Sequence, residues 1–265
     1  MEELKTKNRR EFLAHFSLLS ATALLPISWK NVSQEIKTNN MANYTLAFDV
    51  YGTLINTSSV YTSLRKLVGD KSKLFVETWR NKQLEYSYRQ GLMNRFEGFS
   101  TCTKYALDYT CDYCQVSLSL AQKTNLLNEY LVLPAFSDVK ESLPKLKDAN
   151  HRLFAFSNGE KTTVTNLLKN ANILHFFEGV VSVEKTKVFK PSPIVYKHFN
   201  DVTNSEKENT WLISGNPFDV IGALSYGMNS AWVQRTKETI WDPWTYEPTV
   251  IINQLTELNS KLSHK

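Results

Sequence analysis

The chain has 265 residues, of which 42% are hydrophobic and 22% charged, so it is long enough to bury a sizeable core. With 9 glycines, 8 prolines and neither a low-complexity tract nor an internal repeat, it is not disordered, collagen-like or a solenoid. A net charge of +5 with scattered basic residues gives no sign of a nucleic-acid partner, and three cysteines cannot supply a disulfide framework, so we expect a soluble globular protein.

Residues 1–40 differ from the rest of the chain. A basic start is followed by a short, mostly apolar run that ends at Pro26, which is typical of a secretory signal and too short to span a bilayer. Arg9-Arg10 ahead of Phe12-Leu13 resembles the twin-arginine export signal, so we expect a periplasmic protein without stable membrane insertion. Met41 leaves an alternative open, because translation from there would give a cytoplasmic enzyme.

A parallel sheet is expected from Tyr44 onward. Tyr44–Val50 is a short, nearly continuous apolar run that ends at a glycine-containing turn, as a strand buried on both faces does. After residue 134, further runs of this kind alternate with helical patterns, which predicts an α/β fold with a Rossmann-like doubly wound sheet from residues 43–56 and 134–262. The other expected strands are His151–Ser157, Gly179–Val183, Thr210–Ser214 and Ser230–Gln234, and the expected helices are Ser137–Ala149, Lys161–Asn170, Ile194–Asn200 and Phe218–Tyr226.

Residues 57–133 have a different sequence pattern, with no strand-like run and no proline. We expect a helical cap inserted over the carboxyl edge of the sheet, where open α/β sheets bind ligands. Its expected helices are Val60–Val68, Lys73–Gln90, Phe99–Tyr109 and Leu118–Tyr130. Cys111 and Cys114 form a C-x-x-C pair, but without a second cysteine pair or a βαβ context we expect neither metal nor redox chemistry there. Export would allow a local disulfide between them.

Polar side chains follow the expected strands at one edge of the sheet. Asp49 ends the first strand, Ser157-Asn158-Gly159 follows the second, and Ser214-Gly215-Asn216-Pro217-Phe218-Asp219 follows a later one. Lys190-Pro191 precedes a helix, with Tyr196 six residues after the lysine. A carboxylate buried there needs cations and N–H groups around it, and this set offers them. Asp49 alone is equally compatible with an ordinary turn cap, but the order of the four segments favours a catalytic site.

These segments resemble the four motifs of the haloacid dehalogenase-like superfamily, and within it the type II 2-haloacid dehalogenases. Phe48-Asp49-Val50-Tyr51-Gly52-Thr53-Leu54 is similar to the first motif and Ser157-Asn158-Gly159 to the second. Lys190-Pro191-Ser192-Pro193-x-x-Tyr196 is similar to the third, and Ser214-x-Asn216-x-Phe218-Asp219 to the fourth. Trp79-Arg80-Asn81-Lys82-Gln83-Leu84-Glu85-Tyr86 resembles the cap segment that holds the family's active-site arginine. The resemblance spans about Tyr44 to Gln234 and implies hydrolysis of short-chain L-2-haloacids by a homodimer.

Most members of the superfamily are phosphatases, and two features separate this chain from them. Tyr51 stands where the phosphatases carry a second aspartate that acts as general acid and supports a magnesium site. Ser214 and Gly215 stand where paired acidic residues would complete that site, which leaves too few anionic oxygens for a hard divalent cation. We therefore expect no metal and no cofactor. Two aspartates balanced by Lys190 and Arg80 also suit a small monoanion better than a phosphate dianion.

The resemblance implies a two-step reaction. Asp49 attacks the α-carbon in line, expels the halide and inverts that centre, because an ionised carboxylate can displace halide to form an ester that water cleaves. Water activated by Asp219, with help from Lys190 and Asn216, then attacks the carboxyl carbon of the Asp49 ester.

Five further residues are expected to bind the substrate. Arg80 and Asn158 would cradle the departing halide, and Tyr51 and Phe218 would form an apolar wall. Ser157 and neighbouring backbone N–H groups would hold the substrate carboxylate.

Ser214 and Tyr196 are expected to orient the lysine and the second aspartate, and Tyr196 is also expected to contact the substrate. Some of these residues have simpler interpretations. Arg80 is compatible with a place on the surface of its helix, and Tyr196 and Phe218 with plain core packing. Phe99, a candidate for the cap side of the pocket, is expected to be generic packing.

Two other functions fit the same residues. One is a hydrolase of this superfamily on another substrate, either a phosphatase with unusual metal ligation or an enzyme that opens a small strained ring bearing a carboxylate. The other is an exported protein that binds small carboxylates without catalysis. Halide release from a haloacetate without Mg²⁺ separates these functions.

Overall fold

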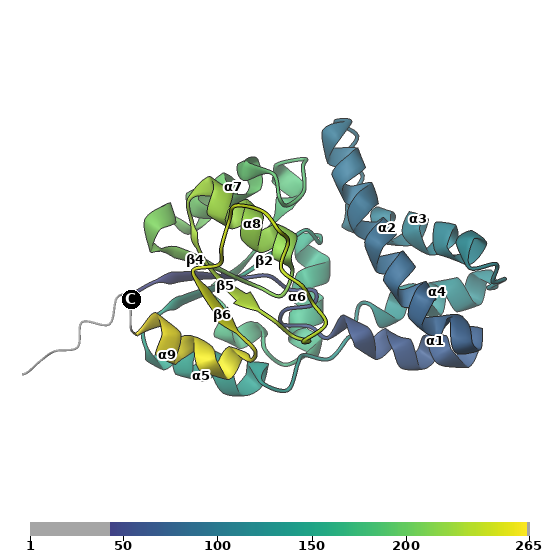
Figure 1. Ribbon diagram of the computed structural model, residues 1–265, viewed down its shortest axis with the longest axis horizontal. Coiled ribbons are helices and arrows are strands. Elements are labelled where there is room, and N and C mark those ends of the chain that lie inside the picture. The colour runs from purple at the N-terminus through teal and green to yellow at the C-terminus, as the bar shows by residue number, and fades with distance from the viewer. Residues whose placement is uncertain (1–42, 264–265) are drawn as a thin grey trace, which may run out of the picture. The chain divides into compact units, whose positions relative to one another are not determined.

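The computed structural model describes residues 43–263 (Figure 1). The expected export leader, residues 1–40, lies outside them. The described residues belong to one compact unit, built on a sheet of six parallel strands in the order β3-β2-β1-β4-β5-β6. The strands are β1 Thr45–Phe48, β2 Arg152–Ser157, β3 Gly179–Ser182, β4 Thr210–Ser214, β5 Asn229–Val233 and β6 Val250–Ile252.

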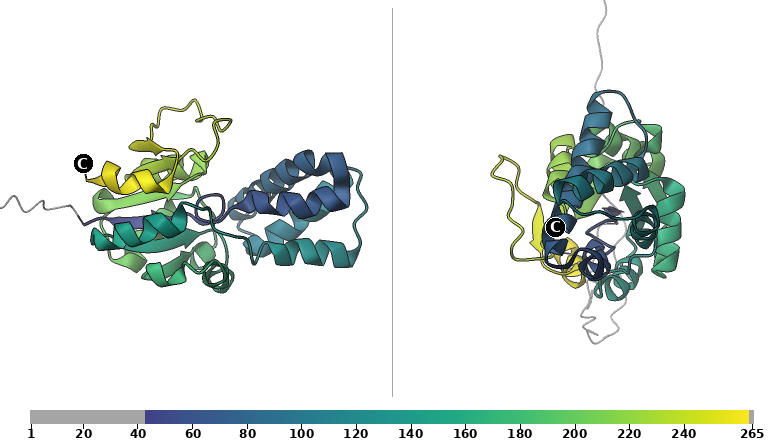
Figure 2. Two further views of the ribbon diagram at one scale, coloured as in Figure 1. Left: turned by 90° about the horizontal axis from the view of Figure 1, so that it is seen from below. Right: turned by 90° about the vertical axis from the view of Figure 1, so that its right-hand side faces the viewer.

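Helices cover both faces of the sheet, as Figure 2 shows. α7 and α8 pack together on one face, and α5 packs with α9 on the other. Both α7 and α8 begin with a proline at the first helical turn and end in a left-handed residue, which are strong start and stop signals. The helices are α5 Val139–Asp148, α6 Lys161–Asn170, α7 Pro193–Thr203, α8 Pro217–Tyr226 and α9 Leu258–Leu262. Short 3-10 turns are η3 Leu174–Phe176, η4 Val183–Lys185, η5 Lys207–Asn209 and η6 Leu255–Glu257.

The α/β prediction is confirmed, and the strand order fixes where a ligand can bind. The chain leaves β1 toward β2 on one side and returns to β4 on the other, so the order reverses between β1 and β4. The carboxyl ends of strands at such a switch point form a crevice. The sequence prediction stops at the fifth strand, because β6 has only three residues and is too short for a periodic pattern.

Between β1 and β2 lies the insert, residues 57–133, in which α2 and α3 pack along each other. The indole Nε1 of the buried Trp79 donates to the Thr103 carbonyl at 2.9 Å and ties the two helices together. α4 begins at a capping box between Ser119 and Gln122. The insert contains η1 Thr57–Ser59, α1 Val60–Val68, η2 Gly69–Lys71, α2 Ser72–Leu92, α3 Phe99–Tyr113 and α4 Leu120–Glu129.

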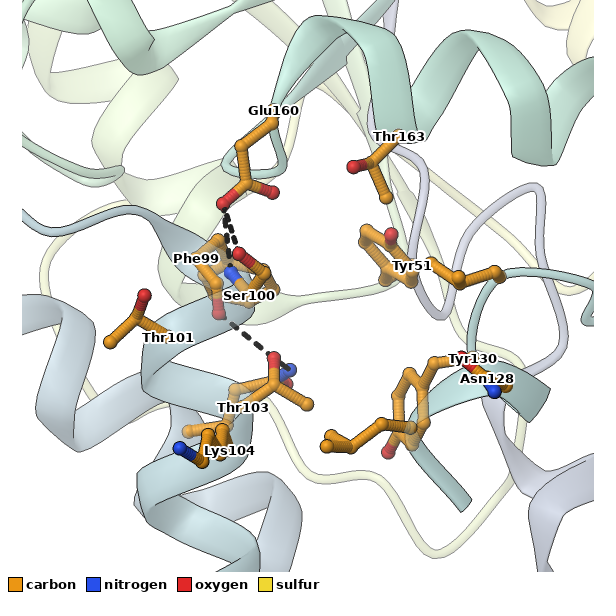
Figure 3. Close-up of a pocket in the computed structure, with 13 residues that line it drawn as sticks. Tyr51, Phe99, Ser100, Thr101, Thr103, Lys104, Asn128, Tyr130, Glu160 and Thr163 are labelled. Atoms are coloured by element: carbon orange, nitrogen blue, oxygen red, sulfur yellow. Dashed lines mark hydrogen bonds between the residues drawn. The ribbon is translucent and has the colours of Figure 1, made fainter. Parts of the chain in front are cut away.

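A cavity of about 330 Å³ lies where α3 and α4 of the insert face the start of α6 (Figure 3). Cys102, Cys111 and Cys114 of the insert are buried free thiols. None of the helices in residues 43–263 is long and apolar enough to cross a membrane.

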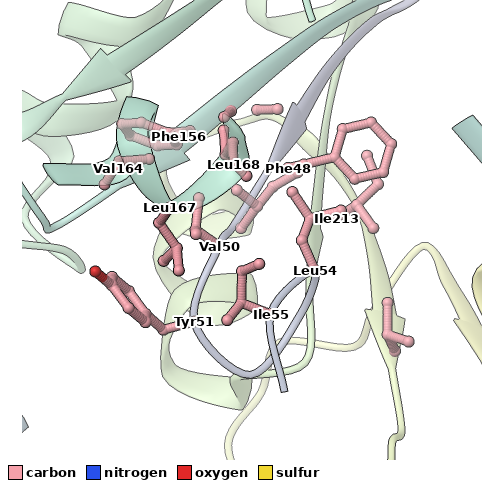
Figure 4. Packing of buried hydrophobic residues seen from close by; sticks show 14 of the residues in the cluster. Phe48, Val50, Tyr51, Leu54, Ile55, Phe156, Val164, Leu167, Leu168 and Ile213 are labelled. Carbon is pink, nitrogen blue, oxygen red and sulfur yellow. The ribbon is translucent and has the colours of Figure 1, made fainter. Parts of the chain in front are cut away.

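The core of the sheet is continuous with the turn after β1. Phe48 on β1 is fully buried, and so are Val50, Leu54 and Ile55 in the turn (Figure 4). Ile55 also pairs with Ala135, where the chain returns from the insert. This packing anchors the turn that carries Asp49, because each buried aliphatic side chain contributes roughly 1.5–3 kcal/mol.

Candidate active site

Asp49 is the first residue after β1 and lies at the switch point of the sheet. Its backbone N–H donates to the Ile213 carbonyl of β4 at 3.0 Å, and the residue is 7% exposed. The chain then turns sharply at Gly52, whose φ of 81° favours glycine, and its N–H donates to the Ile55 carbonyl at 2.9 Å. The turn therefore holds the carboxylate at the edge of the sheet without exposing it.

The two oxygens of Asp49 have unequal surroundings. Oδ2 accepts from Thr53 Oγ1 at 2.7 Å, from Asn216 Nδ2 at 2.8 Å and from Ser214 Oγ at 3.3 Å. Among residues 43–263, Oδ1 accepts a hydrogen bond only from Lys190 Nζ, at 3.3 Å. Oδ1 thus keeps free lone pairs, whereas Oδ2 is already surrounded by donors.

Lys190 is 1% exposed and lies between two carboxylates. Its ammonium donates to Asp49 Oδ1, to Asp219 Oδ2 at 2.8 Å and to the Phe156 carbonyl at 2.9 Å, so all three N–H bonds have acceptors. The side-chain oxygen of Asn158 accepts from the Lys190 backbone N–H at 2.9 Å and fixes the loop. The peptide bond to Pro191 is cis.

Asp219 is fully buried in the first turn of α8. Burial raises the pKa of its carboxyl from 3.8 to about 6, although the positive charge of Lys190 opposes this shift. The Tyr196 hydroxyl donates to Asp219 Oδ1 at 2.8 Å. A Cβ on Gly222 would overlap this hydroxyl, so the close approach of α7 to α8 requires glycine there.

Arg80 on α2 faces the sheet edge. Its guanidinium donates to Gln83 Oε1 at 2.7 Å and reaches Asn216 Oδ1 at 3.5 Å. The alternative of a surface position on the helix is therefore wrong for Arg80, whereas Arg89 on the same helix is exposed and pairs with Glu85. Arg80 brings a positive charge from the insert to the motifs of the core.

Four other predicted residues lie around this centre. Ser157 is buried, and its oxygen accepts from the Gly159 N–H at 3.0 Å. Asn158 is also buried. The Phe218 ring packs against Tyr88 of the insert with centroids 5.6 Å apart. The Tyr51 ring packs against Phe99 at 6.1 Å.

Two predicted roles need revision. Tyr196, which is also expected to contact the substrate, is fully buried and donates to Asp219, so only its expected role toward the second aspartate fits the structure. Ser214 was expected to orient the lysine and the second aspartate, but its hydroxyl donates to Asp49. Phe99 is more than generic packing, because its ring lines the cavity beside Tyr51.

Sequence reasoning missed Thr53 and its support. Thr53 Oγ1 makes the shortest contact to Asp49 and accepts from the Gly215 N–H at 2.8 Å. Its carbonyl accepts from Arg235, which forms a 2.6 Å ion pair with the buried Asp138. A hydroxyl four residues after Asp49, within a glycine turn, was the available signal for Thr53. Nothing local connects Arg235 to this turn.

The donor set at the centre does not suit a divalent cation. Tyr51 supplies no carboxylate, and the space between the two aspartates holds the Lys190 ammonium. In residues 43–263, no three His, Cys, Asp or Glu side chains are grouped so as to hold a metal ion.

Comparison with known proteins gives one family. Residues 46–233 match the model of the haloacid dehalogenase-like hydrolases. The chain is 33% identical over 190 residues to a haloacetate dehalogenase H-2 of Moraxella sp. strain B, which covers 72% of this chain and 85% of that protein. It is 30% identical over 217 residues to an (S)-2-haloacid dehalogenase of Pseudomonas putida, covering 82% of this chain and 95% of the relative.

A solved structure agrees with these relatives. The L-2-haloacid dehalogenase of Xanthobacter autotrophicus with covalently bound chloropropionic acid superposes with a TM-score of 0.77 at 25% identity, over 82% of this chain and 97% of that one. With a family model that spans most of its length and the same fold, this chain belongs to the haloacid dehalogenase-like hydrolases, as its motifs predict.

Proposed function

We propose that the protein hydrolyses the carbon–halogen bond of short-chain 2-haloacids and releases halide and a 2-hydroxy acid. The observation that carries the proposal is the buried group of Asp49, Lys190 and Asp219, in which a lysine ammonium takes the position between the carboxylates. Relatives named haloacetate dehalogenase and (S)-2-haloacid dehalogenase support the substrate class. We take the (S) enantiomer as substrate and the (R)-hydroxy acid as product.

In the first step, Asp49 Oδ1 attacks C2 of the haloacid. Oδ1 is the oxygen for this step because its one hydrogen bond within the described part of the chain comes from Lys190, whereas the lone pairs of Oδ2 are occupied by three donors. A bond forms between Oδ1 and C2, the carbon–halogen bond breaks with inversion, and halide leaves with the bonding pair. The product is an aspartyl ester.

In the second step, water attacks Cγ of the ester. Asp219 accepts a proton from this water, and its raised pKa suits a base that works near neutrality. Negative charge then develops on Oδ2, where Thr53, Asn216 and Ser214 already donate. The Cγ–Oδ1 bond breaks, and the hydroxy acid leaves with Oδ1 and the proton.

The remaining residues hold the small substrate. Arg80 and the side-chain N–H groups of Asn158 bind the departing halide, and Ser157 with nearby backbone N–H groups binds the carboxylate. Tyr51 and Phe218 line the apolar side of the site. Two aspartates balanced by Lys190 and Arg80 leave this site close to neutral, which suits a monoanion that releases another monoanion.

We further propose that the reaction needs no metal. A magnesium-dependent phosphatase of this superfamily would need a carboxylate at the position of Tyr51 and acidic side chains near Ser214 and Gly215.

Oxygen labelling in a single turnover tests the covalent step. With enzyme in excess over (S)-2-chloropropionate in ¹⁸O water, the first hydroxy acid released should carry unlabelled oxygen, and Asp49 should gain the label. Mass spectrometry of the product and of the peptide that contains Asp49 measures both. Label in the first product would mean that water attacks C2 directly and that the ester mechanism is wrong.

The Asp49→Asn variant tests the nucleophile. It should release no halide, because an amide is a poor nucleophile at a saturated carbon, while its circular dichroism spectrum stays that of the parent. A panel of 2-haloacids of both chiralities, assayed with and without chelator, is the companion measurement. Phosphate release from a generic ester that EDTA abolishes, without halide release, would favour a phosphatase instead.

Export and dimer formation are proposals that rest on the sequence alone. Residues 1–40 carry the basic and apolar pattern of a twin-arginine signal. Fractionation of the source cell should find a shortened mature form in the periplasm, and light scattering of the purified enzyme should give the mass of a homodimer. A full-length cytoplasmic form, or a monomer, would contradict the respective proposal.

A further inference from the structure

Arg235 joins the turn that carries Asp49 to two distant parts of the chain. It is the second residue after β5, and its side chain is 13% exposed. One terminal nitrogen of the guanidinium pairs with Asp138 Oδ2 at 2.6 Å, and the other donates to the Thr53 carbonyl at 2.5 Å. The guanidinium also lies over the Phe136 ring, 4.1 Å from its centre. Each of these contacts thus restrains the plane of the guanidinium.

Asp138 is itself fixed, so it can serve as an anchor for Arg235. It is the residue before α5 and is 8% exposed. Its Oδ2, which pairs with Arg235, also accepts from the Leu255 backbone N–H at 2.7 Å. Because hydrogen bonds between charged groups are stronger than neutral ones, Asp138 holds the guanidinium against the Thr53 carbonyl.

The hydroxyl of Thr53 depends on the position of its backbone. Thr53 is fully buried, and its Oγ1 donates to Asp49 Oδ2 at 2.7 Å and accepts from the Gly215 N–H at 2.8 Å. A backbone N–H can only donate, so the hydroxyl hydrogen is left for Asp49. Within the turn, the Thr53 N–H makes a long bond of 3.3 Å to the Val50 carbonyl. The charged contact from Arg235 is shorter and restrains the other end of the same residue.

The same place is where the two connections to the insert meet. The Asn56 N–H donates to the Pro134 carbonyl at 2.9 Å, and the Phe136 N–H donates to the Leu54 carbonyl at 3.0 Å. Arg235 contacts both connections, through Thr53 on one and Phe136 on the other. It therefore restrains the turn at the point where the chain leaves the core and returns to it.

We propose that Arg235 is a positioning residue for hydrolysis of the Asp49 ester. By holding the Thr53 carbonyl, it keeps the Thr53 hydroxyl on Asp49 Oδ2, the oxygen on which negative charge develops in the second step. Donors aimed at such an oxygen lower the barrier only when they are held in place beforehand. The proposal rests on the proposed function, and Arg235 acts through Thr53 rather than on the substrate.

The test removes the contact without leaving a buried charge behind. Arg235→Met alone would strand the Asp138 carboxylate, so it is combined with Asp138→Asn, which keeps an oxygen for the Leu255 N–H. Rapid quenching of the reaction with (S)-2-chloropropionate gives halide release and the esterified fraction of Asp49 against time. This neutral-pair variant should hydrolyse the ester about tenfold more slowly than the parent, with ester formation changed less than about twofold.

A second variant keeps the ion pair. Arg235→Lys retains a positive charge for Asp138 but replaces the two nitrogens of the fork by one. It should show the same selective slowing of ester hydrolysis, by about threefold. If ester formation and ester hydrolysis slow equally in both variants, the damage is general and the positioning role is wrong.

Combination with Thr53→Val shows whether Arg235 acts through Thr53. Once the hydroxyl is gone, its position no longer matters, so adding the neutral pair to Thr53→Val should slow ester hydrolysis by less than about twofold more. A further tenfold loss in the combined variant would mean that Arg235 acts independently of Thr53 and would overturn the proposal.

Arg152 offers a matched control at the other end of the sheet. It begins β2, pairs with Glu178 at 3.0 Å, donates to the Thr203 carbonyl at 2.8 Å and lies 5.0 Å from the centre of the Phe154 ring. Arg152→Met combined with Glu178→Gln makes the same chemical change there. This control should keep the parent rates of both steps, and equal slowing of ester hydrolysis in the control and the neutral-pair variant would refute a specific role for Arg235.

The parent enzyme separates this proposal from the proposed function. If the parent forms the Asp49 ester and releases halide, while the neutral-pair variant keeps the parent rates, only the role of Arg235 is wrong. If the parent forms no ester on Asp49, the proposed mechanism fails and the positioning role fails with it.

Discussion

The two carboxylate oxygens of Asp49 have different surroundings and different roles in the proposed reaction. Oδ1 can attack because Lys190 is its one hydrogen-bond donor among the residues that the structure describes, and Oδ2 lies among donors that stabilise a developing negative charge. This division depends on Thr53, which makes the shortest of the contacts. At the scale of single residues, the proposed chemistry thus depends on the uncharged hydroxyl of Thr53 as well as on the charged side chains.

Replacing Thr53 by valine should therefore slow the second step more than the first. Loss of one donor to the oxyanion lowers such a rate about a hundredfold. We expect a burst of halide followed by slow turnover, with the ester detectable on Asp49 by mass spectrometry. Thr53→Ser keeps the hydroxyl and should restore turnover, whereas a Thr53→Val enzyme without burst or ester would contradict this role.

Tyr196 should set the acid limb of the pH profile. Asp219 must be ionised to accept a proton, and its pKa of about 6 means that kcat falls as the pH drops through that value. The Tyr196 hydroxyl stabilises the ionised form, so Tyr196→Phe raises the pKa of Asp219 and moves the limb to higher pH.

The measurement is kcat against pH for the parent, Tyr196→Phe and Tyr226→Phe. The last variant removes a hydroxyl from the neighbouring stacked ring, which does not touch Asp219. If the acid limb stays in place in Tyr196→Phe, or moves equally in both variants, the Tyr196 hydroxyl does not set the pKa of Asp219.

At the scale of elements, Glu160 links the second motif to the insert. It follows Gly159 directly and binds the first turn of α3 through the Ser100 N–H and hydroxyl. α3 has Gly98 at its N-cap, which offers no side chain, so Glu160 of the core serves as the acceptor for its free N–H groups. Cap and core are thus joined three residues after Ser157, which belongs to the proposed carboxylate site.

Glu160→Ala should loosen this junction. We expect faster hydrogen exchange at the first turn of α3 and a loss of about 1 kcal/mol in the free energy of unfolding, the usual cost of a lost helix cap. Glu160→Gln retains the acceptor oxygen and serves as the matched control. Unchanged exchange in Glu160→Ala would show that α3 is held by its packing on α2 alone.

The elements also show what the sequence could predict and what it could not. In a parallel sheet all strands end at one edge, so locating Asp49, Ser157 and Ser214 at strand ends was enough to bring their segments together. The Glu160–Ser100 contact joins segments 60 residues apart through a side chain without a motif. β6 has too few residues for a pattern, and the cavity depends on how α4 lies against α6.

At the scale of the whole molecule, the buried charges of the site lower stability. The folded pKa of Asp219 lies above its ordinary 3.8, so its contribution to stability is fully present below about pH 4 and is lost as the pH rises through about 6. An ionised Asp219 is therefore less favourable in the folded chain than in water at neutral pH, despite Lys190.

Asp219→Asn should accordingly raise Tm at pH 8 by a few degrees while abolishing turnover. At pH 4 the parent and the variant should unfold at nearly the same temperature, because the parent carboxyl is then protonated. Thermal unfolding followed by circular dichroism at both pH values measures this difference. A variant that is less stable than the parent at pH 8 would mean that Asp219 stabilises Lys190 more than its own burial costs.

The enclosure of Lys190 has a consequence for reagents rather than for substrates. With its ammonium 1% exposed and each N–H bound by an oxygen of the protein, it offers neither a path nor a free lone pair to acylating agents in solution. The lysines on the surface of the same chain have no such shield. Modification of Lys190 would therefore report transient opening of the buried group around it, and the rate of modification would measure how often that opening occurs.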